Sequence, residues 1–138
     1  MKVHTLVETE ESFSNPLSVD VVGSYESLYF ARNALVNRIL ARAQDDMAFA
    51  YAIWNDVNRG DEFREYMLEK TCMEDIASYF DREVEQKKFP EDVERVMCLF
   101  LLEIVEGEEA YHIYVEDASE HMIHFDIKCN ELHWRDEK

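Results

Sequence analysis

The sequence predicts an α+β fold in which an antiparallel sheet, from an N-terminal hairpin and C-terminal strands, packs on a helical middle section. Both ends of the chain alternate apolar and polar residues with the period of a strand, whereas the middle repeats apolar residues at helical spacing. The 138 residues fit a single domain covering 1–138. Three glycines and two prolines are too few for a turn-dense all-β protein.

The N-terminal hairpin is expected from residues 2–9 and 17–23, where β-branched residues alternate with polar ones. The intervening segment, 10–16, is rich in turn formers. Ser24 then follows a glycine and is a good N-cap, so the second strand is expected to end there and a helix to run over 25–43.

Three further helices are expected in the middle of the chain. Segment 45–57 is apolar over most of its circumference, which is typical of a buried helix. Asp61 can cap a short helix after it. Thr71 with Glu74 matches a capping box, and this third helix is expected to end near the lysines at 87–88.

Segment 91–106 has two interpretations. Seven apolar residues match the helical i, i+3, i+4, i+7 spacing, and Pro90 suits a helical first turn. The run 96–102 also matches a buried strand, with 106–109 as a hairpin turn. The seven-position match favours the helix.

Residues 110–117 and 121–131 are expected to form a C-terminal hairpin. A three-residue loop at 118–120 would bring apolar residues together on one face. The expected pairs are Val115 with Ile123, Ile113 with Phe125, and Tyr111 with Ile127. A two-residue loop would set apolar residues against His124 and Asp126, so the three-residue loop is predicted.

The same register places polar residues together on the other face of this hairpin. It puts His112 opposite Asp126 and Tyr114 opposite His124. A His–Asp couple beside a second histidine could bind a transition metal or move a proton, so His112, His124 and Asp126 are candidate metal or catalytic residues. Two facing strands supply few ligands, and no zinc-type spacing is present, so a solvated polar strand face is favoured. We expect no bound metal and no cofactor.

Motifs for nucleophilic catalysis and phosphate binding are missing. The sequence has no G-x-S-x-G elbow, no P-loop and no G-x-G-x-x-G, and its glycines are isolated. Cys72 is expected to be a buried apolar residue beside Met73 and Ile76. A protein that is not an enzyme is therefore favoured.

The cysteines and the apolar segments predict a cytoplasmic protein. Cys72, Cys98 and Cys129 are odd in number and form no C-x-x-C pair, unlike a disulfide framework or a zinc ribbon. No apolar run exceeds eight residues, far fewer than the roughly 18 needed to span a membrane. No signal peptide is recognisable.

Charge is the most informative feature. The formal net charge is −17, which argues against direct binding to nucleic acid or to a membrane surface, because phosphates require clustered Lys and Arg. The charge is also uneven. Segment 96–127 contains eight acids and no Lys or Arg, whereas 24–44 contains three arginines and one glutamate.

Three function classes remain. The favoured class is a non-enzymatic acidic protein that binds a basic partner protein, in its sharper form as a nucleic-acid-mimicking inhibitor. The second is a structural or accessory domain, such as a homodimer through a sheet edge, whose charge serves only solubility. The third is a small enzyme that uses the His–Asp candidates. For the first class the expected interaction residues are Glu103, Glu106, Glu108, Glu109, Glu116, Asp117 and Glu120.

Overall fold

The computed structural model describes residues 2–12, 17–81, 83–84, 88–115 and 121–131. Four strands form one antiparallel sheet in the order β2-β1-β4-β3. They are β1 (Lys2–Ser12), β2 (Ser18–Tyr25), β3 (Ala110–Val115) and β4 (His121–Glu131). The two hairpins meet where β1 pairs with β4, so the strands from the two ends of the chain form the centre of the sheet.

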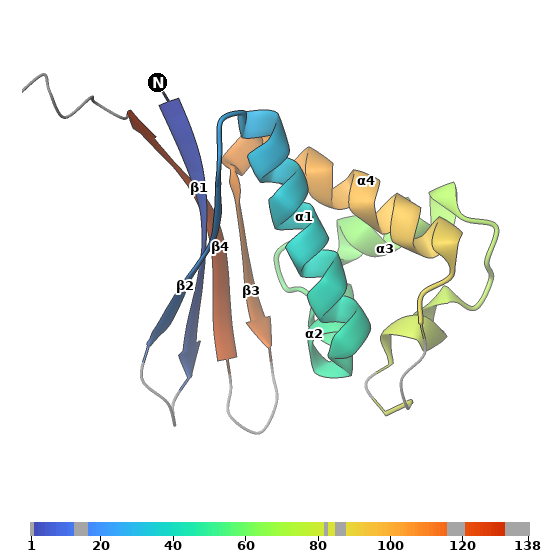
Figure 1. Cartoon of the computed structure of the whole chain (residues 1–138). Coiled ribbons are helices and arrows are strands. Elements are labelled where there is room, and N and C mark those ends of the chain that lie inside the picture. Colours follow the sequence, from blue (N-terminus) through green and yellow to red (C-terminus); the bar gives the residue numbers. More distant parts are fainter. Residues whose placement is uncertain (1, 13–16, 82, 85–87, 116–120, 132–138) are drawn as a thin grey trace, which may run out of the picture.

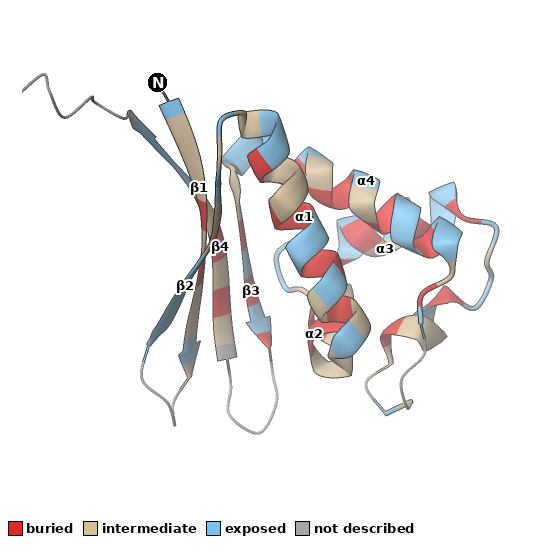
Figure 2. Ribbon diagram, in the orientation of Figure 1, coloured by how far each residue is buried: buried red, intermediate tan, exposed pale blue. Residues whose placement is uncertain are grey.

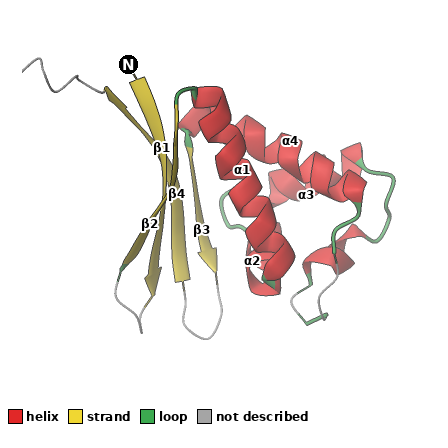
Figure 3. Ribbon diagram, viewed as in Figure 1, coloured by secondary structure: helices red, strands yellow, loops and turns green. Residues whose placement is uncertain are grey.

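The helices come from the middle of the chain and lie on one side of the sheet (Figures 1 and 3). They are α1 (Leu28–Asp45), α2 (Met47–Trp54), α3 (Gly60–Lys70), the short 3-10 helix η1 (Ile76–Phe80) and α4 (Glu91–Glu108). Helix α1 crosses the sheet, α2 and α4 pack against β3, and α3 packs against α2 and α4. The predicted α+β class is confirmed.

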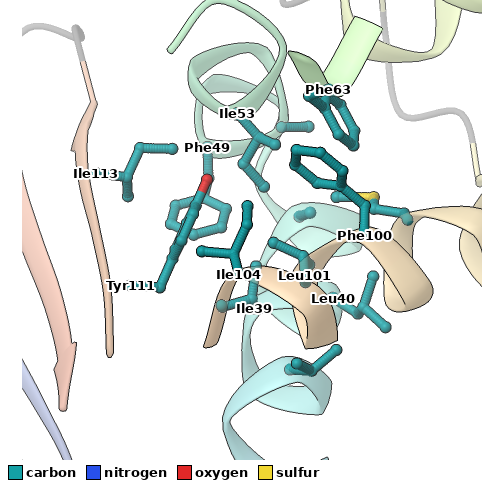
Figure 4. Packing of buried hydrophobic residues seen from close by; sticks show 14 of the residues in the cluster. Ile39, Leu40, Phe49, Ile53, Phe63, Phe100, Leu101, Ile104, Tyr111 and Ile113 are labelled. Atoms are coloured by element: carbon teal, nitrogen blue, oxygen red, sulfur yellow. The ribbon is translucent and has the colours of Figure 1, made fainter. Parts of the chain in front are cut away.

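A single apolar cluster fills the space between the sheet and the helices. Figure 2 shows buried positions on the helices and on strands β1, β3 and β4. In the close-up of Figure 4, Tyr111 and Ile113 of β3 lie in this cluster with Phe49 of α2 and Ile104 of α4. The alternation seen in the sequence therefore identifies the inner face of the C-terminal hairpin.

The register of that hairpin differs from the prediction by two residues. Ile113 lies opposite Ile123, and His112 lies opposite His124 rather than Asp126. The strands are joined by five residues, 116–120, which lie outside the described part of the chain. A shift of two residues leaves every side chain on its predicted face, so the apolar pattern alone could not exclude it.

The junction between β2 and α1 also lies later than predicted. Strand β2 continues through Gly23 and Ser24, and a bulge interrupts its pairing with β1 between Val21 and Gly23. Ser27 is the N-cap of α1, and its hydroxyl accepts a hydrogen bond from the Tyr29 amide at 3.1 Å. Both serines have the right chemistry for a cap, and only the path of the bulged strand distinguishes them.

The helix predicted to begin at Thr71 is wrong. Thr71 ends α3 instead, because its hydroxyl donates to the carbonyl of Met67 at 2.7 Å. The segment that follows forms only the short helix η1, and Cys72 is exposed rather than buried. The predicted end at Lys87 lies outside the described residues.

Helix α4 confirms the helical interpretation of 91–106, and its strand alternative is wrong. The helix extends to Glu108, and Glu109 then adopts a left-handed conformation with φ of 55°. The acids at 106–109 are therefore the last turn and the C-cap of a helix rather than a hairpin turn. This places them at the end of α4 that leads into β3.

Candidate functional site

The arginines of α1 bind the acids of β1. The carboxylate of Glu8 is buried, and it accepts hydrogen bonds from Nε of Arg38 at 3.0 Å and from Nη1 of Arg42 at 3.3 Å. Arg42 also donates to Glu10 at 2.6 Å. The hydrogen bond from Glu8, followed by its negative charge, raises the pKa of the Arg38 guanidinium. The net-positive segment 24–44 is thus used to hold α1 on the sheet rather than to form a basic surface.

The predicted interaction residues at the end of α4 are divided between ion pairs and solvent. Arg32 of α1 pairs with Glu109 at 3.3 Å, and Arg59 pairs with Glu108. The side chain of Glu106 is exposed, while its carbonyl accepts a hydrogen bond from Arg32. Glu116, Asp117 and Glu120 lie outside the described residues.

Glu103 belongs to a different feature, a groove between α3 and α4 with a volume of about 360 Å³. Its rim carries four carboxylates, three from α3 and one from α4. The lining residues are Arg59, Glu62, Glu65, Tyr66, Glu69, Phe100, Glu103 and Ile104. We call this feature the α3–α4 groove.

The spacing of the α3 glutamates explains their convergence. Glu62, Glu65 and Glu69 are separated by three and four residues, which aligns them along one face of a helix. None of the three lies in the base-free segment 96–127 on which the predicted interaction residues depended, and α3 also contains Arg64 and Lys70. Helical spacing of acids within a mixed-charge segment was the signal that could have found them.

The floor of the groove is aromatic. The rings of Tyr66 and Phe100 are 5.3 Å apart between centroids, and those of Phe63, which is buried, and Phe100 are 5.2 Å apart. The ammonium group of Lys70 lies 5.8 Å from the centroid of Tyr66. A ring in this position attracts cations through its negative face. The groove therefore combines an apolar floor with an anionic rim.

Only one edge of this rim is neutralised. Arg59 lies 3.9 Å from Glu62 and also pairs with Glu108. Within the described ranges, no base lies at ion-pair distance from Glu65, Glu69 or Glu103. These three exposed carboxylates are consequently available to a cation supplied by another molecule.

The structure does bring the His–Asp candidates together, although through a different register. His112 Nε2 lies 3.1 Å from Asp126 Oδ1, diagonally across the hairpin, and the rings of His112 and His124 are 4.6 Å apart. All three lie on the sheet face away from the helices, because their neighbours in β3 and β4 are buried. Across the described residues, no group of three or more His, Cys, Asp or Glu side chains is placed to hold a metal ion.

A second hollow of about 240 Å³ lies beside β3 and has mixed charge, with Asp56, Arg59 and Glu108 among its lining residues. Tyr111 lines it as well and is almost completely buried. Desolvation, reinforced by the charge of Asp56, raises the pKa of the Tyr111 phenol well above its usual range. Mutually compensating charges make this hollow a weaker candidate than the α3–α4 groove.

None of the described helices has the length and apolar content required to cross a membrane. No protein-family model matches the chain, and no curated protein or solved structure matches it significantly. Function is therefore inferred from the geometry of the chain alone.

Proposed function

We propose that this protein is a non-enzymatic binding protein that engages a partner protein with a basic surface through the α3–α4 groove. The observation that carries the proposal is the convergence of Glu65, Glu69 and Glu103 around the aromatic floor formed by Tyr66 and Phe100. Two helices that pack in the core supply these groups, so the rim and the floor are held in place by the fold. We expect it to act in the cytoplasm.

The groove suits an arginine or lysine side chain. The apolar stem of such a residue can lie over Tyr66 and Phe100, while its charged end reaches the carboxylates of the rim. The contact of Lys70 with the Tyr66 ring illustrates the chemistry that this floor accepts. Arginine fits best, because its planar guanidinium stacks on aromatic rings and donates two parallel hydrogen bonds to a carboxylate.

The charge of the whole chain supports the same proposal. Five arginines of the described part, Arg32, Arg38, Arg42, Arg59 and Arg64, are engaged in ion pairs within the protein. In the described part of the chain, few arginines are therefore left unpaired to offset the net charge of −17 that a partner meets. Such a field accelerates the approach of a basic protein and discriminates against acidic ones.

The sharper form of the proposal is that the partner is a nucleic-acid-binding protein and that this chain inhibits it by mimicry. Carboxylates repeated along a helix can occupy sites that otherwise hold phosphates, which gives Glu62, Glu65 and Glu69 this role. A mimic must compete with nucleic acid for one surface of the partner. Addition of excess DNA or RNA should then release the partner, and a partner that stays bound would restrict the proposal to acidic binding in general.

Affinity capture from the native cell tests the proposal. The groove variant carries Glu65→Gln, Glu69→Gln and Glu103→Gln. The control variant carries Glu11→Gln, Glu26→Gln and Glu74→Gln, which changes the net charge equally at exposed positions outside the groove. We expect the groove variant to lose its basic partner and the control to retain it, with partners identified by mass spectrometry. Equal loss from both variants would show that only net charge matters and would contradict the groove.

A further inference from the structure

Strands β2 and β3 form the two edges of the sheet, and they differ in how they are protected (Figure 1). Strand β3 packs against α2 and α4 and is flanked by the charged residues of the second hollow, whereas α1 is the helix that packs against β2. The regular part of β2, up to the bulge after Val21, has a single ionisable residue, Asp20. An edge strand with few charges presents unpaired backbone groups on which another strand can pair.

The outward side chains of this segment form an apolar stripe. Leu17, directly before β2, and Val19 and Val21 within it are 58%, 57% and 67% exposed, and Figure 2 shows the first part of β2 as exposed. Asp20 lies opposite Glu8, whose carboxylate faces α1, so the odd-numbered residues point to the sheet face away from the helices. We call Leu17, Val19 and Val21 the β2 stripe.

We propose that two copies of this chain associate by antiparallel pairing of their β2 edges, with the twofold axis at Val19. In this register Val19 lies opposite Val19 of the second copy, and Leu17 lies opposite Val21 in both directions. Every member of the β2 stripe then meets another apolar side chain, and the two sheets become one. The interface is isologous, so one stripe supplies both sides of it.

Charge and the bulge distinguish this register from two alternatives. An axis at Asp20 would set two carboxylates directly opposite each other, whereas the axis at Val19 places Asp20 opposite Ser18. An axis at Val21 would pair Val19 with Gly23, beyond the bulge. Copies with a charge of −17 repel each other over most of their surface, and the β2 segment is an edge at which they can approach with little charge. A basic partner, by contrast, is expected to bind the carboxylates of the α3–α4 groove.

Sedimentation velocity of the full chain, from about 1 μM to about 1 mM, tests the proposal. We expect the mass to rise with concentration from 16.4 kDa toward twice that value. Val19→Asp and Val19→Lys should each raise the dissociation constant of the dimer about tenfold or more, since each places like charges across the axis. Val57→Asp, at a residue that is 93% exposed between α2 and α3, should leave the dimer unchanged.

An equimolar mixture of the Val19→Asp and Val19→Lys chains tests the register itself. Because residue 19 meets residue 19, the mixture should regain the dimer that each variant lacks alone. Circular dichroism checks that both variants are folded, which is expected at an exposed site. A monomeric wild-type chain over the whole range, dimers that persist in both variants, or a mixture that stays monomeric would each overturn the proposal.

Discussion

Glu8 determines how α1 lies on the sheet. Its buried carboxylate accepts hydrogen bonds from Arg38 and Arg42, which lie one turn apart on α1. A buried carboxylate is stable only when its oxygens accept hydrogen bonds, and the two arginines donate them. In return, the carboxylate offsets the positive charge of both guanidinium groups. The sequence showed these arginines as a basic helix, but it could not show that their partners come from a strand some thirty residues earlier.

Replacing Glu8 by glutamine should lower the free energy of unfolding by about 2 kcal/mol, the range of hydrogen bonds to charged groups. The variant keeps the shape of the side chain and removes its charge, which leaves Arg38 without its carboxylate. Glu11→Gln, on the exposed face of the same strand, should change stability by less than about 0.5 kcal/mol. Urea denaturation measures both, and equal values for the two variants would contradict the role of Glu8.

Tyr111 predicts how stability changes in alkali. Its pKa is raised in the folded protein by burial, so the native state keeps the phenolic proton after the unfolded chain has lost it. Its contribution is therefore full below the unfolded pKa of about 10 and falls above it by about 1.4 kcal/mol per pH unit. Tyr111→Phe should unfold at higher pH than the wild type, whereas Tyr29→Phe, at an exposed residue, should not. Identical alkaline transitions in all three proteins would contradict this prediction.

At the scale of elements, the end of α4 combines a backbone cost with an ion pair. Glu109 has a left-handed conformation that costs most residues about 1 kcal/mol, and its carboxylate pairs with Arg32. Glu109→Gly relieves the backbone and removes the charge, whereas Glu109→Gln removes the charge alone. We expect the glycine variant to be the more stable of the two by about 1 kcal/mol at all salt concentrations. Thermal denaturation measures the stability of both variants. Equal stability of the glycine and glutamine variants would mean that the left-handed conformation has no energetic cost.

The elements that sequence could predict were those with a long apolar period. The seven-position pattern of α4 and the alternation of β1 and β4 are repeated many times, so local errors do not change the result. Boundaries that depend on one residue were wrong. Thr71 can begin a helix or end one, and the aromatic contacts of Phe80 with Trp54 and Phe89 hold the following segment as a short turn. The sequence contains no local signal for those contacts.

Over the whole molecule, the charged groups that form internal ion pairs lie apart from the carboxylates that are exposed to solvent. Arginines and their partner acids join α1 to the sheet, while the glutamates of the α3–α4 groove face outward. The prediction of an acidic interaction surface was located by counting acids along one segment, 96–127. Within the described part of the chain, Glu103 is the predicted residue that belongs to the groove, because a groove draws on two helices and no single segment contains it.

The net charge of −17 predicts that salt stabilises the folded chain. Like charges repel more strongly in the compact state than in the unfolded one. Salt shortens the screening length from about 30 Å at 0.01 M to about 3 Å at 1 M and weakens this repulsion more than it weakens the buried pairs of Glu8. The melting temperature should rise between these conditions. A fall would mean that exposed ion pairs contribute more than the repulsion costs.

The central claim is that the α3–α4 groove, rather than negative charge as such, binds the basic partner. Its most direct test is to measure the dissociation constant of the captured partner by titration calorimetry. Three proteins are compared: the wild type, the groove variant with Glu65, Glu69 and Glu103 changed to glutamine, and the control variant of equal charge. We predict that the constant rises about tenfold or more for the groove variant and much less for the control, with the gap narrowing as salt screens the rim. Equal constants for the two variants would contradict the claim.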